Sequence, residues 1–258
     1  MIIFRHKTLW LAILAIIIAS TGIIKLQKNS LIAESEKQKK TSYLKQEKSL
    51  QATVEIQKGL PSFSLDNLIA DWNYLQFIQY FGDTKAREAT GYSLVTDYFE
   101  VIADKDPHFT QAFLSLSAAN SLFAGRPEKT VDFINEVLES ASPNLPGYPF
   151  LLWTYKATDE ILFLGDLEAA KNSYKMAAKW ASQRDDEIGD EMASRYLTTA
   201  KYLAGNPDSR NARIVAWTNV LNQAPDSKTQ QRAIDELKKL GVDVLIDQEG
   251  KFTINRTT

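Results

Sequence analysis

The chain contains no cysteine, only two histidines and no marked excess of either charge. The absence of cysteine excludes disulfides, thiolate nucleophiles, cysteine-ligated metals and a lipid attached to cysteine. His6 flanks an apolar segment and His108 lies between two expected helices, so a histidine-based metal or acid-base site is not expected. A formal net charge of −2 offers none of the concentrated lysine and arginine that nucleic-acid binding requires. We therefore expect no metal, no cofactor and no nucleic-acid partner.

The motifs of common enzymes are also missing. There is no phosphate-binding loop, dinucleotide fingerprint or nucleophile elbow, and the segment 249–251 lacks the upstream glycine that a phosphate loop requires. An acidic cluster could hold a divalent cation, but it has no calcium-loop glycine, and acidic residues at a helix start favourably oppose the helix dipole. The cluster comprises Asp185, Asp186, Glu187, Asp190 and Glu191. We favour the dipole interpretation and expect neither catalysis nor a small-molecule substrate.

One long apolar run, Thr8–Ile24, carries no charge and is bounded by Lys7 and Lys25. Its seventeen residues are at the short end of what spans a bilayer as a helix, and the flanking lysines can reach the interface. A cleaved secretory signal is the alternative, because residues 5–7 are basic, although Ile18-Ala19-Ser20 is a poor cleavage site. We favour an uncleaved, single-pass membrane anchor over residues 1–26.

The side of the membrane on which the rest of the chain lies stays open. The lysines that follow the anchor outnumber the cations before it, which favours a cytoplasmic body, whereas the short basic N-terminal tail favours export. Residues 27–61 are polar and lysine-rich, and they contain no glycine or proline before Gly59. We expect this segment to be a charged, partly helical linker or stalk.

The strongest signal in the sequence is a period of forty residues. Gly125, Gly165 and Gly205 follow one another at that interval, and each ends an apolar helical stretch. A fixed period of this size is typical of stacked helix pairs, because one pair cannot bury its own apolar face. With Gly82 ending an earlier helix, the pattern predicts an all-α fold of about four antiparallel helix pairs over residues 62–225. Each glycine is expected to end its helix in a left-handed conformation.

Apolar residues recur at helical spacing before and after each glycine. In the first pair Leu68, Trp72, Leu75 and Ile78 form the expected apolar face. The other expected helices run over residues 85–103, 109–125, 127–143, 153–165, 167–178, 192–205 and 214–225.

The third pair resembles a tetratricopeptide repeat. Gly165, Ala170, Tyr174 and Ala177 match that family in residue type and spacing, and the other pairs are degenerate versions of the pattern. The resemblance covers about Leu65 to Pro225. The segments Ala70-Asp71-Trp72 and Gln79-Tyr80-Phe81-Gly82, followed by Asp104, Pro107 and Phe109, resemble bacterial membrane-anchored repeat proteins. The tetratricopeptide resemblance implies a right-handed α-solenoid. A pitch near forty instead of thirty-four leaves a related helical-repeat array as an alternative.

The resemblance also implies a function in interaction. In this family a groove lined by the first helices holds a protein or peptide partner. Placed on this sequence, the groove residues would be Gln76, Tyr155, Asp159, Arg195 and Thr199. We therefore expect a membrane-tethered scaffold or adaptor that helps to assemble a membrane complex. The alternative is a stoichiometric structural subunit of an envelope or membrane machine.

Residues 226–258 form the expected C-terminal region. An amphipathic helix with Ala233, Ile234, Leu237 and Leu240 is expected to end at Gly241 and to cap the last helix pair. The segments 242–246 and 251–254 predict a short β-hairpin with its turn at 249–250. Because two isolated strands are only marginally stable, the hairpin either packs on the last helix or is completed by a partner.

Overall fold

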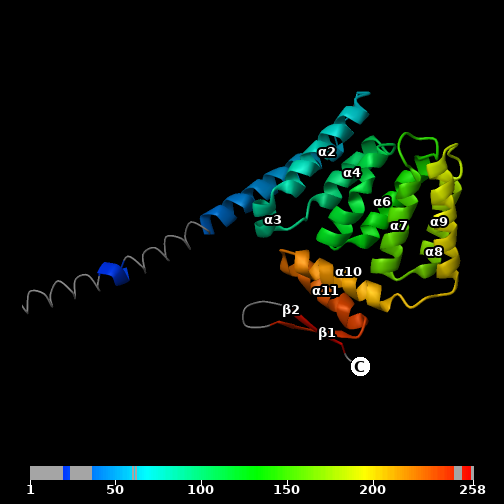
Figure 1. Ribbon diagram of the computed structural model, residues 1–258. Helices are drawn as coiled ribbons and strands as arrows, with labels where there is room; N and C mark the ends of the chain where they lie inside the picture. Colours follow the sequence, from blue (N-terminus) through cyan, green and yellow to red (C-terminus); the bar gives the residue numbers. More distant parts are fainter. Residues whose placement is uncertain (1–19, 24–36, 60, 62, 247–251, 257–258) are drawn as a thin grey trace, which may run out of the picture. The chain divides into compact units, whose positions relative to one another are not determined.

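A computed structural model of the chain describes residues 20–23, 37–59, 61, 63–246 and 252–256 (Figure 1). Over these residues, no helix has both the length and the apolar character needed to cross a bilayer. The expected anchor, Thr8–Ile24, lies almost entirely outside the described residues, as does the expected turn of the hairpin at residues 249–250. The chain divides into an N-terminal segment, residues 1–48, and a body, residues 49–258.

The described part of the chain is mostly helical. Residues 20–23 and 37–48 of the N-terminal segment are helical, and the body begins with helical residues 49–59. The other elements of the body, in chain order, are α2 (Asp66–Gly82), α3 (Thr84–Thr90), α4 (Val95–Lys105), α5 (Thr110–Leu114), η1 (Ser117–Phe123), α6 (Pro127–Ser140), α7 (Phe150–Asp159), η2 (Glu160–Leu164), α8 (Leu167–Ala181), α9 (Glu187–Ala204), α10 (Arg210–Gln223), α11 (Ser227–Lys239), β1 (Val242–Ile246) and β2 (Phe252–Arg256). The segments η1 and η2 are π-helical.

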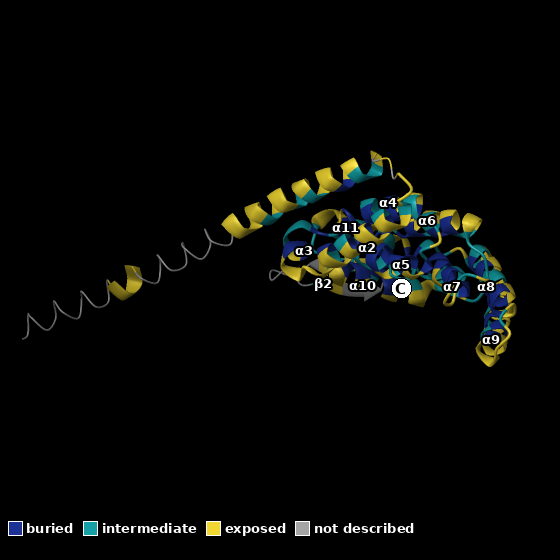
Figure 2. Cartoon of the chain, turned by 90° about the horizontal axis from the view of Figure 1, so that it is seen from above, coloured by how far each residue is buried: buried dark blue, intermediate teal, exposed yellow. Residues whose placement is uncertain are grey.

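Helix pairs make up most of the body, and buried residues lie between the helices while exposed residues lie on their outer faces (Figure 2). In the first pair α2 packs on α4, in the second η1 packs on α6, and in the third α7 packs on α8. The helix expected over residues 85–103 is divided into α3 and α4, because Gly91 has a positive φ of 76° that ends α3.

Helical residues 49–59, which were expected in the linker, contribute to the core of the body. Val54 is 1% exposed and packs in the same cluster as Phe99. The Lys58 ammonium lies 2.8 Å from a carboxylate oxygen of Asp97 and 2.8 Å from one of Glu100. Burial alone would lower the pKa of Lys58, but these carboxylates raise it above its usual range. The segment is therefore joined to α4 by both apolar and charged contacts.

The expected orientation of α2 was wrong. Leu68, Trp72, Leu75 and Ile78 are all exposed, while the opposite face of the helix, with Ala70, Asn73, Phe77 and Tyr80, is buried. Phe77 contacts Phe99 with 4.8 Å between ring centroids, and Tyr80 contacts Tyr98 with 5.5 Å. Because α2 is apolar on both faces, periodicity alone does not decide which face is buried, and these aromatic contacts decide it.

The glycines at 125 and 165 end their helices as expected. Their φ angles are 62° and 70°, in the left-handed region that favours glycine. After each glycine, the next backbone N–H donates to a carbonyl six residues earlier, at Asn120 and at Glu160, over 2.8 Å in both cases. Asp166 then caps α8 by accepting a hydrogen bond from the Ala169 N–H.

The expectation for Gly205 was wrong. Its φ is −76°, and the positive φ lies at Asn206 instead, with a value of 51°. The fourth expected pair is not formed either, because α9 packs on α8 whereas α10 packs on η1, η2 and α11. Figure 1 shows α10 and α11 lying across the ends of the preceding helices, away from α9. The apolar face of α10, with Trp217 buried against Phe163, accounts for this placement.

The C-terminal hairpin is confirmed. β1 and β2 are antiparallel, with Val244 opposite Ile254. β1 packs on α11, and Val242 is 1% exposed in the same cluster as Trp217 and Leu237. The hairpin is thus packed on the last helix, which is one of the two arrangements expected for it.

Candidate functional site

A cavity of about 470 Å³ opens where α10 crosses the first helices of the second and third pairs. α10 packs on η1 and η2, the segments that end these first helices, and the cavity lies beside this contact, on the face that the first helices were expected to offer to a partner. The cavity is lined by Ser117, Ala118, Leu122, Leu151, Thr154, Tyr155, Thr158, Asp159, Leu162, Phe163, Ala216 and Asn219. We call it the α7–α10 pocket.

The α7–α10 pocket has an exposed mouth and a buried floor. Ala118 and Tyr155 are exposed at the mouth. Asp159, Phe163 and Ala216 are buried on the floor. Largely apolar walls with a few convergent polar groups are typical of binding sites. Both π-helical segments contribute to the walls, and such segments often occur at functional sites.

The Asp159 carboxyl is the most unusual group of the pocket. It is fully buried, with one oxygen 2.9 Å from the Ser117 hydroxyl and the other 3.0 Å from the Ser121 hydroxyl, both of which donate to it. Burial raises the pKa of Asp159 to about 7, although the two hydroxyl donors act in the opposite direction, and the nearby Glu160 adds to the rise. This carboxyl therefore changes its charge near neutral pH.

Asp159 belongs to a chain of buried hydrogen bonds that runs away from the pocket. The Ser121 hydroxyl contacts the Thr130 hydroxyl over 2.8 Å, and the Asn120 amide donates to Thr130 over 3.1 Å. The Thr96 hydroxyl in turn donates to the side-chain amide oxygen of Asn120 over 2.9 Å. These contacts join η1 to α6 and α4, and so they help to fix the two serines of η1 that hold the Asp159 carboxyl.

Glu160, the neighbour of Asp159, is held by a cation instead of by hydroxyls alone. Its carboxylate accepts from the Lys156 ammonium over 2.5 Å and from the Ser173 hydroxyl over 2.7 Å, and Lys156 also donates to Ser173 over 3.0 Å. All three side chains are buried. The cluster joins α7 and η2 to α8, outside the α7–α10 pocket.

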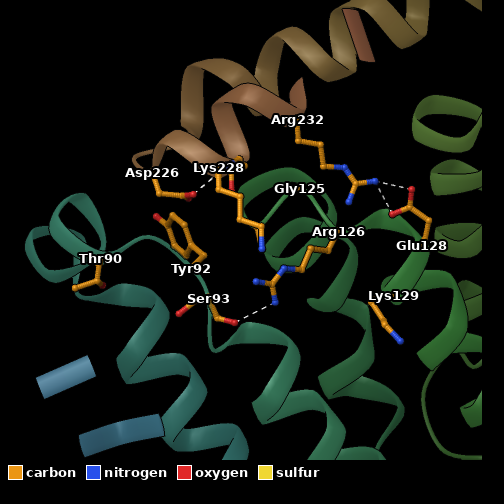
Figure 3. A pocket seen from close by; sticks show the side chains of 12 residues that line it. Thr90, Tyr92, Ser93, Gly125, Arg126, Glu128, Lys129, Asp226, Lys228 and Arg232 are labelled. Carbon is orange, nitrogen blue, oxygen red and sulfur yellow. Dashed lines mark hydrogen bonds and ion pairs between the residues drawn. The ribbon is translucent and has the colours of Figure 1, made fainter. Parts of the chain in front are cut away.

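A second cavity, of about 440 Å³, lies where α11 approaches the loops before α4 and α6 (Figure 3). Two of its four cationic side chains, those of Arg126 and Arg232, serve as structural links. Arg232 donates two hydrogen bonds to the Glu128 carboxylate, and Arg126 donates to the Ser93 carbonyl and to the Thr96 hydroxyl. Burial raises the pKa of Glu128, but Arg232 lowers it below its usual range. We interpret this cavity as a junction between α11 and the second pair.

The acidic cluster at residues 185–191 has a structural role. The Asp186 carboxylate accepts a hydrogen bond from the Gly189 N–H over 2.8 Å and so caps α9, and Arg184 pairs with the same carboxylate. Nowhere in the described ranges do three histidine, aspartate or glutamate side chains come together as metal ligands.

The structure brings two of the five expected groove residues together. Tyr155 and Asp159 line the α7–α10 pocket. Gln76 is half-buried on α2, Arg195 is exposed on α9, and the Thr199 hydroxyl donates to the Arg195 carbonyl, so these three residues lie away from the pocket. Sequence reasoning missed Ser117 and Ser121, whose spacing of four residues on one helix face was the available signal.

No protein-family model matches the chain, and neither the curated proteins nor the solved structures include a significant match.

Proposed function

We propose that the chain is a membrane-tethered, tetratricopeptide-like interaction protein that holds a protein or peptide partner and helps to assemble a membrane complex. The first three helix pairs would form a short right-handed α-solenoid. The tether would be the apolar segment Thr8–Ile24. A binding function fits the sequence better than catalysis, since no catalytic motif was found in it.

The α7–α10 pocket is the observation that carries this proposal. Its walls, including Leu122, Leu151 and Leu162, suit an apolar side chain of the partner. The exposed Tyr155 at the mouth can add contact area and a hydroxyl for hydrogen bonding at little entropic cost. With an exposed mouth and a buried floor, the pocket can receive a projecting side chain of a larger molecule, which is how peptide grooves gain specificity.

The test places a photoreactive residue at the mouth. Tyr155 is replaced by p-benzoylphenylalanine in the full chain, and the crosslinked products are separated by mass after illumination of intact cells. The matched control carries the same residue at Tyr202, an exposed tyrosine on α9 that does not line the pocket. A third variant combines the probe at Tyr155 with Ala118→Trp, which fills the pocket from its mouth.

We expect a discrete protein product from the probe at Tyr155, none of the same mass from Tyr202, and at least a tenfold loss when Ala118→Trp is added. Equal products from both probe positions would contradict the proposal, as would a product that Ala118→Trp leaves unchanged.

The exposed apolar face of α2 favours a second candidate function, that of a stoichiometric structural subunit. The same photoreactive residue placed at Ile78, on this face of α2, distinguishes the two functions by the amount of crosslinked product. An adaptor should give a small and variable yield of partner, whereas a structural subunit should give one partner in constant proportion to the chain.

A further inference from the structure

A narrow apolar stripe runs along the exposed face of α2. It consists of Leu68, Trp72 and Leu75 together with Leu65, the N-cap residue that directly precedes α2, and we call these four residues the α2 seam. Their side chains are between 53% and 62% exposed. Their spacings of three, four and three residues match the a and d positions of a heptad repeat. Ile78, 47% exposed, lies beside the end of the seam.

The seam is unusual because α2 already buries its opposite face. Phe77 and Tyr80 pack in the core of the body, so the helix is apolar on two sides. Helices that are apolar all round are normally covered all round. Such a stripe on a helix surface therefore marks a contact with another molecule.

The shape and charge of the seam indicate the kind of partner. A strict a and d stripe is the narrow contact that a second helix makes, whereas helices that lie on lipid carry a broader apolar face with lysine and arginine beside it. α2 contains no lysine or arginine, and its two charged residues are Asp66 and Asp71. A helix of another protein chain thus fits the seam better than an anionic membrane surface.

The area of the seam suits a second copy of the same chain. The exposed parts of the seam and of Ile78 amount to roughly 500 Å² in each copy, so complete burial of these side chains in a pair would remove about 1,000 Å², the lower bound for a specific interface. Most soluble oligomers are twofold symmetric, and a twofold axis requires a surface that complements itself.

We propose that the chain self-associates through the α2 seam, with the α2 helices of the two copies antiparallel. In this register Leu65 lies opposite Leu75 of the second copy, and Leu68 lies opposite Trp72 of the second copy. Each layer then combines side chains that fill it evenly, and Asp66 and Asp71 stay at the rim. A parallel pair would instead place the two Trp72 indoles in one layer and leave the neighbouring layers underfilled.

The absence of cysteine makes a direct test possible, because each introduced cysteine is unique. Full-length chains with Leu65→Cys and Leu75→Cys, carrying different affinity tags, are co-expressed, and freshly broken cells are oxidised with copper phenanthroline. Non-reducing electrophoresis then separates mixed dimers from dimers of one kind. The control is Val215→Cys on α10, which is 58% exposed and apolar but lies outside the seam.

We expect the amount of the mixed dimer to be at least five times that of each single-kind dimer and of the Val215→Cys dimer. Adding Leu68→Glu to both chains should reduce the mixed dimer at least tenfold, because a charge enters the seam, whereas adding Val215→Glu should not. Leu68 is 62% exposed, so Leu68→Glu should leave the thermal unfolding of the body nearly unchanged.

Three outcomes would overturn the proposal. A mixed dimer no more abundant than the Val215→Cys dimer would mean that no second copy lies on the seam. Dimers dominated by Leu65→Cys with itself would mean a parallel pair. A fluorophore on Leu75→Cys that is quenched by brominated lipid, with no mixed dimer present, would mean that a membrane covers the seam.

Discussion

The first helices of the second and third pairs end alike, whereas the helix that ends at Gly205 differs from both. At Gly125 and Gly165 a π-helical segment precedes a left-handed glycine, and a buried polar residue, Asn120 or Glu160, lies five residues before it. The helix before Gly205 is α-helical to its end, and the corresponding position is occupied by the buried apolar Ala200.

The difference between these helix ends shows which part of the structure the forty-residue period specifies. At the two similar ends, the buried polar residue is anchored to the helix after the glycine, through Thr130 or through Ser173, and that helix turns back and packs. At Gly205 the equivalent Ala200 offers no polar group to hold the next helix, and α10 crosses to η1 and η2 instead. We infer that the glycine allows the turn, while the buried polar contact and the apolar face of the next helix determine where the chain goes.

The largest effect is expected from breaking the polar contact of the third pair. Glu160→Ala leaves the buried Lys156 ammonium without its anion, and the loss of one partner of a buried ion pair typically costs about 3–5 kcal/mol of unfolding free energy. Urea unfolding, followed by circular dichroism, measures this loss. The control is the double variant Lys156→Met with Glu160→Leu, which removes both charges and should recover most of the stability. A cost below about 1 kcal/mol for Glu160→Ala would mean that the contact does not hold the pair together.

The next largest effect concerns Asp159, whose partners are hydroxyls and not a cation. Because burial raises its pKa to about 7 in the folded chain, the folded state retains a proton that the unfolded state releases, and stability from this group is lost as the pH rises from about 4 to 7. Asp159→Asn removes this titration. We expect the stability of the variant relative to the wild type to increase over that pH range, by up to about 4 kcal/mol for a shift of about three units.

The measurement is a series of urea unfolding curves between pH 4 and pH 8. Asp185→Asn, a change at an exposed carboxyl, serves as the control and should show no comparable trend. A pH dependence that is the same in Asp159→Asn and in the wild type would show that Asp159 does not titrate in this range.

Periodicity and turn chemistry predicted the local structure of the chain well. The helices that end at Gly82, Gly125 and Gly165 and the C-terminal hairpin follow from apolar spacing and from the conformational freedom of glycine. The break at Gly91 was missed because a single glycine within a helical pattern is often tolerated.

Long-range contacts were predicted less well. The orientation of α2 and the position of α10 both depend on which of several apolar surfaces match, and spacing within one helix does not contain that information. Two pocket residues, Tyr155 and Asp159, were expected from the family pattern. Ser117 and Ser121 were missed, because hydroxyls on a helix are more often solvated than buried beneath a carboxyl.

The smallest expected effect is the difference in stability between alanine variants of Gly165 and of Gly205. Gly165→Ala should cost about 1–2 kcal/mol, because a φ of 70° is unfavourable for residues with a Cβ. The new Cβ would also lie 2.6 Å from Cζ of Arg213. Gly205→Ala should change stability by less than about 0.5 kcal/mol, since its φ is −76° and its Cβ would lie 3.3 Å from the Tyr202 carbonyl oxygen.

Urea unfolding of the two glycine variants, each compared with the wild type, measures this difference. Repeating Gly165→Ala in an Arg213→Ala background removes the close approach and leaves the backbone strain alone, so most of the cost should remain. Equal costs at residues 165 and 205 would contradict the distinction between the two helix ends. If the cost of Gly165→Ala disappears with Arg213→Ala, glycine is needed at residue 165 because α10, on which Arg213 lies, packs closely against it. The left-handed turn before α8 would then not be the reason. In that case the glycine period would reflect the packing of α10 on the first helices more than the need for a left-handed turn.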